Sequence, residues 1–250
     1  MRGTVKSLLM WTAALAWMVA GGSFAAEIRV LSAGAVEPGL VRLIDAFQRE
    51  TGHKVTAAFA TAPAIRKRIS EGETPDVLVA PPAVLDELVR GGKAPAGNRA
   101  AVGRVGVGIA VRDGAPVPRI ATVEEFKQSM LEAESLVYNE ASTGIHVAGV
   151  VERLGLAERL KSKTTRYPDG AAVLDHLARG KGKEIGFGAT TEILAYGKKG
   201  LKLVGPLPPE LQSYTSYAAT AMAAGSAAEA FVRYITTPSA KAALAATGVE

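Results

Sequence analysis

The stretch EIRVLSAGAVEPGLVRLIDAFQRETGHKVTAAFATAPAIRKRISEGETPDVLVAPPAV, residues 27–84, decides the fold of this chain. Short apolar strands are expected at Ile28–Leu31, Val55–Phe59 and Asp76–Ala80, with amphipathic helices between them. Strands that alternate with helices of this length predict an α/β fold with a parallel sheet covered by helices on both faces. The two strand-to-helix turns consist of small residues, so helix amides would be open toward a ligand there.

The rest of the chain repeats this alternation. Leu136–Asn139 and Ile185–Ala189 are expected to be strands, and Ser142-Thr143-Gly144 begins a helix. Two further segments, Val102–Val111 and Tyr214–Ala224, are long and nearly uncharged, which indicates extended strands. We therefore expect a second α/β unit after the first.

Residues 1–25 have the pattern of a cleaved export signal. Arg2 and Lys6 precede an uncharged apolar run at Leu8–Ala20, and Ser23-Phe24-Ala25 supplies small residues before a cleavage site. An uncleaved N-terminal anchor is the alternative, although the run is short for a membrane span of about 20 residues. We expect a periplasmic protein secreted through this signal.

The amino-acid composition argues against several classes of protein. The chain has no cysteine, so it contains no disulfide and no site for a lipid on an N-terminal cysteine. Loss of the signal lowers the formal net charge from +5 to about +3, and the remaining Lys and Arg residues are spread along the chain. This distribution argues against a nucleic-acid surface. The mature length is enough for two lobes of ordinary size.

No catalytic motif is evident. Ser32, Ser142, His146, Asp169 and Asp175 could be combined into a hydrolase triad, but the Gly-x-Ser-x-Gly elbow and paired carboxylates are absent. The three histidines lack metal-ligand spacing. We expect no enzymatic activity, no metal and no cofactor, with a hydrolase as the alternative that turnover assays would reveal.

The order of several segments resembles periplasmic solute-binding proteins of ABC importers, and among these the molybdate-binding group of type II. The segments that carry this resemblance are Ile28–Ala35, Phe59–Ala62, Gly72–Val79, Thr143–Ile145, Ile185–Gly188 and Phe231–Lys241. The resemblance implies two α/β lobes joined by two crossing strands, with a ligand in the cleft between them. Residues 26–102 would form the first part of lobe 1, 103–212 lobe 2 with the first crossing, and 213–250 the second crossing and the return to lobe 1.

The resemblance also implies a function. The protein would be a monomer that captures a small anionic solute and delivers it to an ABC permease in the inner membrane. The residues expected to bind the solute are Gly34, Ala35, Thr61, Ala62, Thr143, Gly144, Tyr167, Gly170 and Ala189. A periplasmic sensor that reports ligand occupancy to a membrane partner is the alternative function.

The ligand itself stays open between an oxyanion and a small organic anion. Where the molybdate pattern has two serines and a tyrosine, this chain has Ala35, Ala62 and Ala189, although Ser32, Thr61 and Thr190 are close in sequence. Loss of hydroxyl donors disfavours a site built for a molybdate- or tungstate-like oxyanion. Tyr214 and Tyr217 are interpreted as structural, because strand alternation would place them on different faces.

Overall fold

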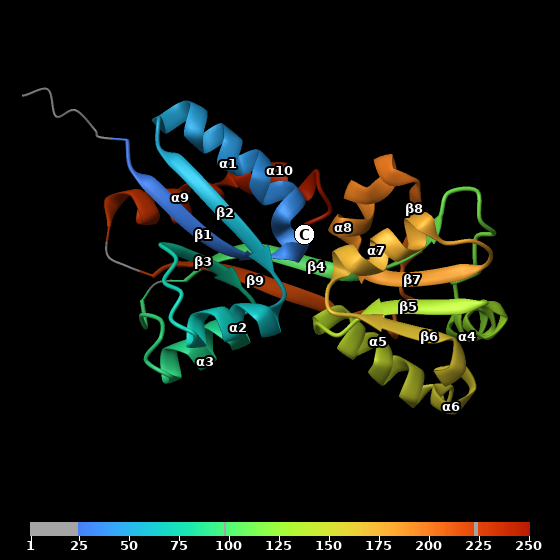
Figure 1. Cartoon of the computed structure of the whole chain (residues 1–250). Coiled ribbons are helices and arrows are strands. Elements are labelled where there is room, and N and C mark those ends of the chain that lie inside the picture. The colour runs from blue at the N-terminus through green and yellow to red at the C-terminus, as the bar shows by residue number, and fades with distance from the viewer. Residues whose placement is uncertain (1–24, 98, 223–224) are drawn as a thin grey trace, which may run out of the picture.

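Figure 1 shows the computed structural model of the chain, which describes residues 25–97, 99–222 and 225–250. The expected export signal lies outside the described residues except for its last position, Ala25. Within the described ranges, we find no helix with the length and apolar character needed to cross a membrane.

The first half of the molecule is built on three parallel strands. β1 (Glu27–Ala33) lies between β2 (Lys54–Ala60) and β3 (Val77–Ala80). The helices that connect and cover them are α1 (Glu37–Thr51), α2 (Ala62–Ser70) and α3 (Pro82–Arg90). Figure 1 shows α1 on one face of these strands and α2 and α3 on the other. The residue pattern of 27–84 therefore predicted this unit correctly.

The second half repeats the arrangement. β5 (Ser135–Asn139) lies between β6 (Thr164–Tyr167) and β7 (Glu184–Ala189), parallel to both. The accompanying elements are α4 (Val123–Glu132), α5 (Ser142–Arg153), α6 (Ala157–Leu160), α7 (Gly170–Arg179), α8 (Thr190–Ala195) and β8 (Leu201–Pro206). Our sequence analysis did not predict β6 or α8, because β6 is polar and partly exposed and α8 is very short.

Two long strands join the halves. β4 (Ala100–Arg112) and β9 (Tyr214–Ala221) pair with each other in antiparallel orientation. β9 also pairs with β3 in the first half, and β4 pairs with β7 and β8 in the second. The result is one continuous mixed sheet with two lobes, as Figure 1 shows. Its pairings are parallel among β1, β2 and β3 and among β5, β6 and β7, and antiparallel wherever β4 or β9 takes part.

The C-terminal segment returns to the first half. α9 (Ser226–Ile235) and α10 (Pro238–Ala245) pack against α1. The last residue then pairs with β4, where the Arg104 amide donates to the Glu250 carbonyl at 2.7 Å and the Glu250 amide donates in return at 2.8 Å. This return places Ile28, near the start of the described residues, and Val249, near their end, in one hydrophobic core.

Each lobe has its own core. The first lobe has one cluster that includes Leu31, Phe47 and Phe231, and the rings of Phe47 and Phe231 meet edge to face at 5.1 Å. In the second lobe, one cluster under α4 and α5 contains Phe126, and a smaller one under α7 and α8 contains Leu174. The cores of the two lobes are mostly distinct, although Ala189 at the end of β7 belongs to the first-lobe cluster and α8 contacts α1. Only β4 and β9 carry the sheet from one lobe to the other.

Shortening one buried side chain of the returning segment tests the role of this segment in the core of the first lobe. We expect Phe231→Ala to lower the free energy of unfolding by about 3–5 kcal/mol, because it leaves a cavity beside Phe47. The measurement is urea unfolding followed by circular dichroism. Val41→Ala on the exposed face of α1 is the control and should change the free energy of unfolding by less than about 0.5 kcal/mol. Equal effects of the two variants would contradict this assignment of the core.

Candidate functional site

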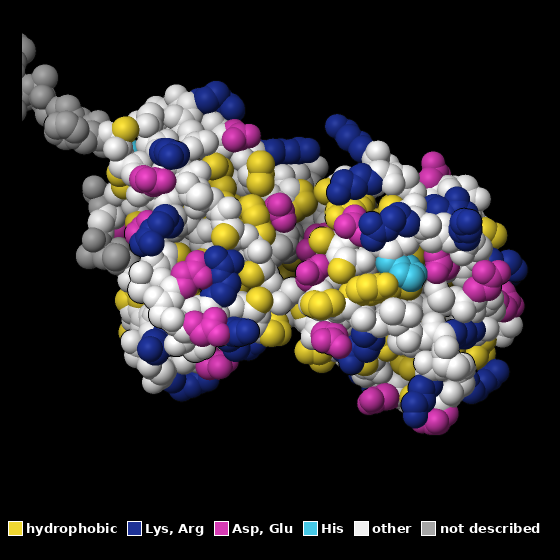
Figure 2. All heavy atoms as spheres, in the orientation of Figure 1, with side chains coloured by type: hydrophobic (Ala, Val, Ile, Leu, Met, Phe, Trp, Pro, Cys, Tyr) yellow, Lys and Arg dark blue, Asp and Glu magenta, His cyan; other side chains and the backbone are white. Residues whose placement is uncertain are grey.

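A cleft of about 420 Å³ lies between the two lobes. Figure 2 shows it as a groove across the middle of the molecule, with acidic side chains at its edges. Its walls come from the segments that follow β1, β2 and β3 in the first lobe and β5, β6 and β7 in the second. Parallel strands end at the same edge of a sheet, and ligands of open α/β sheets bind at that edge.

Seven of the nine predicted ligand-binding residues line this cleft. They are Gly34, Ala35, Thr61, Ala62, Thr143, Gly170 and Ala189. The first four come from the lobe-1 turns and the other three from the lobe-2 turns. The structure thus brings together residues from five turns that are far apart in sequence, and their role as ligand contacts stays a prediction.

The structure places the other two predicted residues away from the cleft wall. Gly144 is buried behind it, where its amide donates to the Asn139 side-chain oxygen at 3.0 Å. A Cβ at Gly144 would lie 1.6 Å from the Asn139 carbonyl oxygen, so this glycine is required by close packing. Tyr167 turns toward α7, and its hydroxyl is 2.8 Å from His176 Nδ1.

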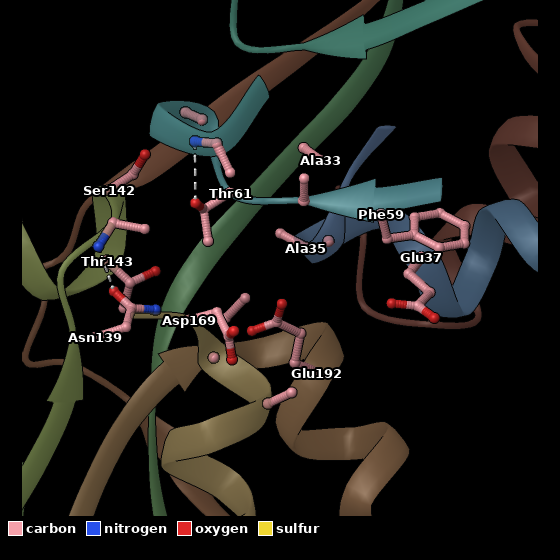
Figure 3. A pocket seen from close by; sticks show the side chains of 18 of the residues that line it. Ala33, Ala35, Glu37, Phe59, Thr61, Asn139, Ser142, Thr143, Asp169 and Glu192 are labelled. Atoms are coloured by element: carbon pink, nitrogen blue, oxygen red, sulfur yellow. Dashed lines mark hydrogen bonds between the residues drawn. The ribbon is translucent and has the colours of Figure 1, made fainter. Parts of the chain in front are cut away.

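At the three alanine positions of the predicted ligand set, the cleft wall lacks the hydroxyl groups that the molybdate pattern has there. Ser32 does not replace one of them, because it is fully buried in β1 and its hydroxyl donates to the Ala33 carbonyl at 3.2 Å. Of the three nearby hydroxyl residues, only Thr61 lines the cleft. Its oxygen caps α2 by accepting from the Ala64 amide at 3.4 Å, so its hydroxyl proton is free to donate to a ligand (Figure 3).

Asn139, at the end of β5, orders the start of α5. Its side-chain oxygen accepts from the amides of Ala141 and Gly144, both at 3.0 Å. This leaves the amide nitrogen of Asn139, together with the Ser142 and Thr143 hydroxyls, as donors at the cleft wall. Sequence analysis missed Asn139, although its place at the carboxyl end of an expected strand was a usable signal.

Arg68 is the only Lys or Arg in the described cleft wall. It lies seven residues after Thr61, two helical turns along α2, and therefore on the same side of that helix. Its Nε and Nη2 donate to the Glu73 carboxylate, at 2.5 and 2.7 Å. Nη1 is not engaged in this ion pair, so the guanidinium has a donor left for an anionic ligand.

Three carboxyl groups face the same cleft, and sequence analysis named none of them as ligand contacts. Glu37 comes from α1, Asp169 caps α7, and Glu192 comes from α8. In Figure 3 the side chains of Asp169 and Glu192 point toward one another within the cavity. Asp169 accepts from the Ala172 amide at 2.8 Å, whereas Glu192 belongs to none of the ion pairs in the described part of the chain.

The environment of Glu192 changes its acidity. Burial raises the pKa of its carboxyl to about 7, and the charges of Glu37 and Asp169 act in the same direction. A backbone hydrogen bond from Ala189 opposes this shift. A carboxyl with a pKa near neutrality in a cleft is typical of a functional group.

Tyr217 also lines the cleft, although we interpreted it as structural. It comes from β9 and is buried, and burial together with the charge of Glu192 raises the pKa of its hydroxyl. Tyr214, three residues earlier, lies outside the cleft and is covered by the Arg104 guanidinium, 4.3 Å from the ring centre. Alternation along β9 did separate the two rings, but it placed Tyr217 toward the ligand cavity.

His146 does not reach the cleft. Its Nε2 is 2.7 Å from the Leu211 carbonyl oxygen, so it ties α5 to the segment before β9. Among the described residues, no group of three His, Asp or Glu side chains is arranged to hold a metal ion.

One further contact joins the two lobes beside the cleft. The Thr191 hydroxyl of α8 donates to the Ala35 carbonyl of the first turn at 2.5 Å. Glu192 follows directly in sequence, so this bond helps to hold its side chain against lobe 1.

Residues 28–250 match the family of bacterial extracellular solute-binding proteins. The chain belongs to this family. It is 28% identical over 235 residues to a protein named aconitate isomerase from a Pseudomonas species, covering 89% of this chain and 87% of that one. This similarity spans both lobes and the cleft between them.

Solved structures share the fold. The periplasmic molybdate-binding protein of Azotobacter vinelandii aligns with a TM-score of 0.73 at 19% identity, over 89% of this chain and 98% of that one. PEB3 with bound L-phospholactate aligns with a TM-score of 0.69 at 14% identity, over 88% and 98%; PEB3 is a Campylobacter jejuni protein. The two-lobed fold of a molybdate-binding-like type II periplasmic binding protein is thereby confirmed.

The raised pKa of Glu192 predicts a specific pH dependence of stability. Between the ordinary pKa of 4.5 and about 7, the folded protein holds a proton that the unfolded chain has lost, so stability falls as pH rises. We expect Glu192→Gln to remove this dependence. The variant should gain about 2 kcal/mol relative to the wild type between pH 5 and pH 8.

Urea unfolding of both proteins at pH 5, 6, 7 and 8 measures this difference. Glu210→Gln, at an exposed carboxyl that does not line the cleft, is the control and should follow the wild type at every pH. A difference between Glu192→Gln and wild type that stays constant with pH would contradict the prediction.

Proposed function

We propose that this protein captures a small organic anion in the interlobe cleft and delivers it to an ABC permease of the inner membrane. The observation that carries the proposal is the mixed charge of the cleft wall, with one guanidinium, Arg68, and three carboxyl groups. A compact dianion would lie close to all of these carboxyls and would be repelled. A longer organic anion can place its carboxylates beside Arg68 and its uncharged carbons beside the acidic side chains.

The size and lining of the cleft support an organic ligand. Its volume of about 420 Å³ is within the usual range for sites that enclose small organic molecules. Ala35, Ala62 and Ala189 present methyl groups where hydroxyls would serve an oxyanion. Phe59 adds an apolar wall from the end of β2.

Donors for the carboxylates come from two helix starts. α2 and α5 begin at the cleft, and their first amides favour anions. The hydroxyls of Thr61 and Thr143 stand at these starts, and Arg68 can add a charge-assisted hydrogen bond. The ligand would therefore bridge the lobes, and lobe closure around it would follow the hinge motion of such proteins.

The relative named aconitate isomerase supports a polycarboxylate as the ligand class. Sensing is the alternative role for the same binding event. A neighbouring permease and ATPase in the genome would favour transport, and a neighbouring sensor kinase would favour signalling. We further propose that the mature protein is a periplasmic monomer that needs no cofactor and binds no nucleic acid.

A thermal-shift and calorimetric panel tests the ligand class. The panel contains citrate, tricarballylate, cis- and trans-aconitate, molybdate, tungstate, sulfate and lysine. We expect polycarboxylates to stabilise the mature protein by about 2.7 kcal/mol at 100 times their dissociation constant. Stabilisation by molybdate and tungstate alone would overturn the organic ligand, and stabilisation by lysine alone would overturn the anion.

The role of Arg68 is tested by substitution. We expect Arg68→Gln to weaken polycarboxylate binding about 10- to 100-fold, because it removes a charge-assisted hydrogen bond worth about 1.5–3 kcal/mol. Arg66→Gln is a matched control on the same helix: Arg66 pairs with Glu87 at 2.6 Å outside the cleft. Titration calorimetry should give the Arg66 variant the wild-type affinity. Unchanged affinity in Arg68→Gln would remove Arg68 from the site.

A further inference from the structure

We propose that the cleft binds its anion together with one proton, which the Glu192 carboxyl holds while it donates a hydrogen bond to a carboxylate of the ligand. This inference rests on the proposed binding of an organic anion. It adds the group that lowers the negative charge of the occupied cleft, and it makes capture of the ligand depend on pH.

The charge of the cleft wall is the first support. Among the described residues that line it, three side chains are acidic and Arg68 alone is basic, which gives a formal charge of −2 when all four are ionised. The Arg68 guanidinium already pairs with Glu73, so part of its charge is balanced before a ligand arrives. Like charges repel more strongly in a cleft than in bulk water. A polyanion would therefore bind weakly here unless one acidic group became neutral.

Glu192 is the acidic side chain that both lobes enclose. A Cβ at Gly34 of lobe 1 would lie 3.2 Å from its Oε1, and a Cβ at Gly170 of lobe 2 would overlap its Oε2. The preceding residue, Thr191, is held against lobe 1 by its bond to the Ala35 carbonyl. Backbone from two lobes thus replaces part of the water around the carboxyl, and loss of water favours the uncharged form. Figure 3 shows this side chain directed into the cavity.

The groups that face Glu192 also favour its uncharged form. Burial raises its pKa most, to about 7, and the charges of Glu37 from α1 and Asp169 from the start of α7 add to this. The Ala189 amide opposes the shift by donating to the carboxyl. Tyr217 of β9 is a neutral neighbour, because the pKa of its hydroxyl is raised as well. The other elements packed against α8, which are β4, β7, β8 and the short turns beside α1 and α8, place no charged side chain in the described cleft wall.

The other two acidic side chains are less suited to hold the proton. Asp169 accepts from the Ala172 amide at 2.8 Å as the N-cap of α7, and a helix N-terminus favours the charged form. Glu37 lies in the first turn of α1, and only partial burial raises its pKa. For Glu192, burial and two neighbouring carboxylates act together.

A protonated Glu192 can serve the helix and the ligand at once. The bond from the Ala189 amide needs one carboxyl oxygen, which leaves the other to hold a proton and donate it. A hydrogen bond from an acid to a carboxylate is charge-assisted and strong. Arg68 in the lobe-1 wall can bind a second carboxylate of the same ligand. An extended polycarboxylate would then meet a cation in one lobe and an uncharged donor in the other.

This linkage fixes the direction of the pH dependence. Below a pH of about 7 the free protein already holds the proton, so its affinity for a fully ionised ligand changes little. Above this pH each binding event takes a proton from the solvent. The apparent dissociation constant then rises by up to about tenfold per pH unit.

Titration calorimetry with tricarballylate and with citrate between pH 7.5 and 9, where the carboxyls of both ligands are ionised, tests the inference. Runs in two buffers of different ionisation enthalpy count the protons. The wild type should take up about 0.8 to 1 proton per ligand and lose at least about 10-fold in affinity over this range. Glu192→Gln keeps a donor but cannot titrate, so it should bind without proton uptake and with an affinity that does not change with pH. Glu210→Gln, at an exposed carboxyl away from the cleft, is the control and should follow the wild type.

A second variant separates the hydrogen bond from the loss of charge. Glu192→Ala is also neutral but has no donor, so it should bind about 10-fold or more weakly than Glu192→Gln at every pH. Equal affinities of these two variants would overturn the hydrogen bond to the ligand.

The remaining outcomes are distinct. Binding to the wild type without proton uptake would overturn this inference and leave the proposed function standing. Proton uptake that persists in Glu192→Gln would overturn the assignment to Glu192. No binding of any carboxylate in the panel would defeat the proposed function itself, and this inference with it.

Discussion

The antiparallel pairing of β4 with β9 is the interaction on which the site depends. Each lobe has a largely distinct core, and these two strands carry one hydrogen-bonded sheet from one lobe into the other. Because the parallel strands of both lobes end beside this crossing, their small-residue turns face each other across a single cleft. A register change between β4 and β9 would separate the two walls.

The cleft wall contains both hydrogen-bond donors that attract an anion and carboxyl groups that repel it. Helix-start amides, Thr61, Thr143 and Arg68 attract an anion, while three carboxyl groups oppose it. Under the proposed function, such a wall would select by shape, since an extended ligand can satisfy the donors and keep its charge away from the acids. The near-neutral pKa of Glu192 follows from the same crowding of carboxylates and from burial.

Much of this could be predicted from residue patterns. Strand–helix alternation indicated the α/β class, and the small-residue turns together with the family resemblance pointed to Gly34 and Thr61 at the cleft wall, while the resemblance alone added Gly170. Local sequence patterns did not predict β6, which is polar and partly exposed, or α8, which has only six residues. Glu192 was missed for that reason, because nothing in its neighbourhood identifies a helix of six residues as part of the site.

The sequence by itself determined the elements and their order, since periodicity and turn residues act over a few positions of the chain. Only the tertiary structure decided which side chains share the cleft. Tyr217 and Glu192 come from segments that no local pattern connects with Gly34, and strand pairing brings them together. The raised pKa of Glu192 likewise could not be predicted from the sequence. It depends on burial and on Glu37 and Asp169, which are distant along the chain and near only in the folded protein.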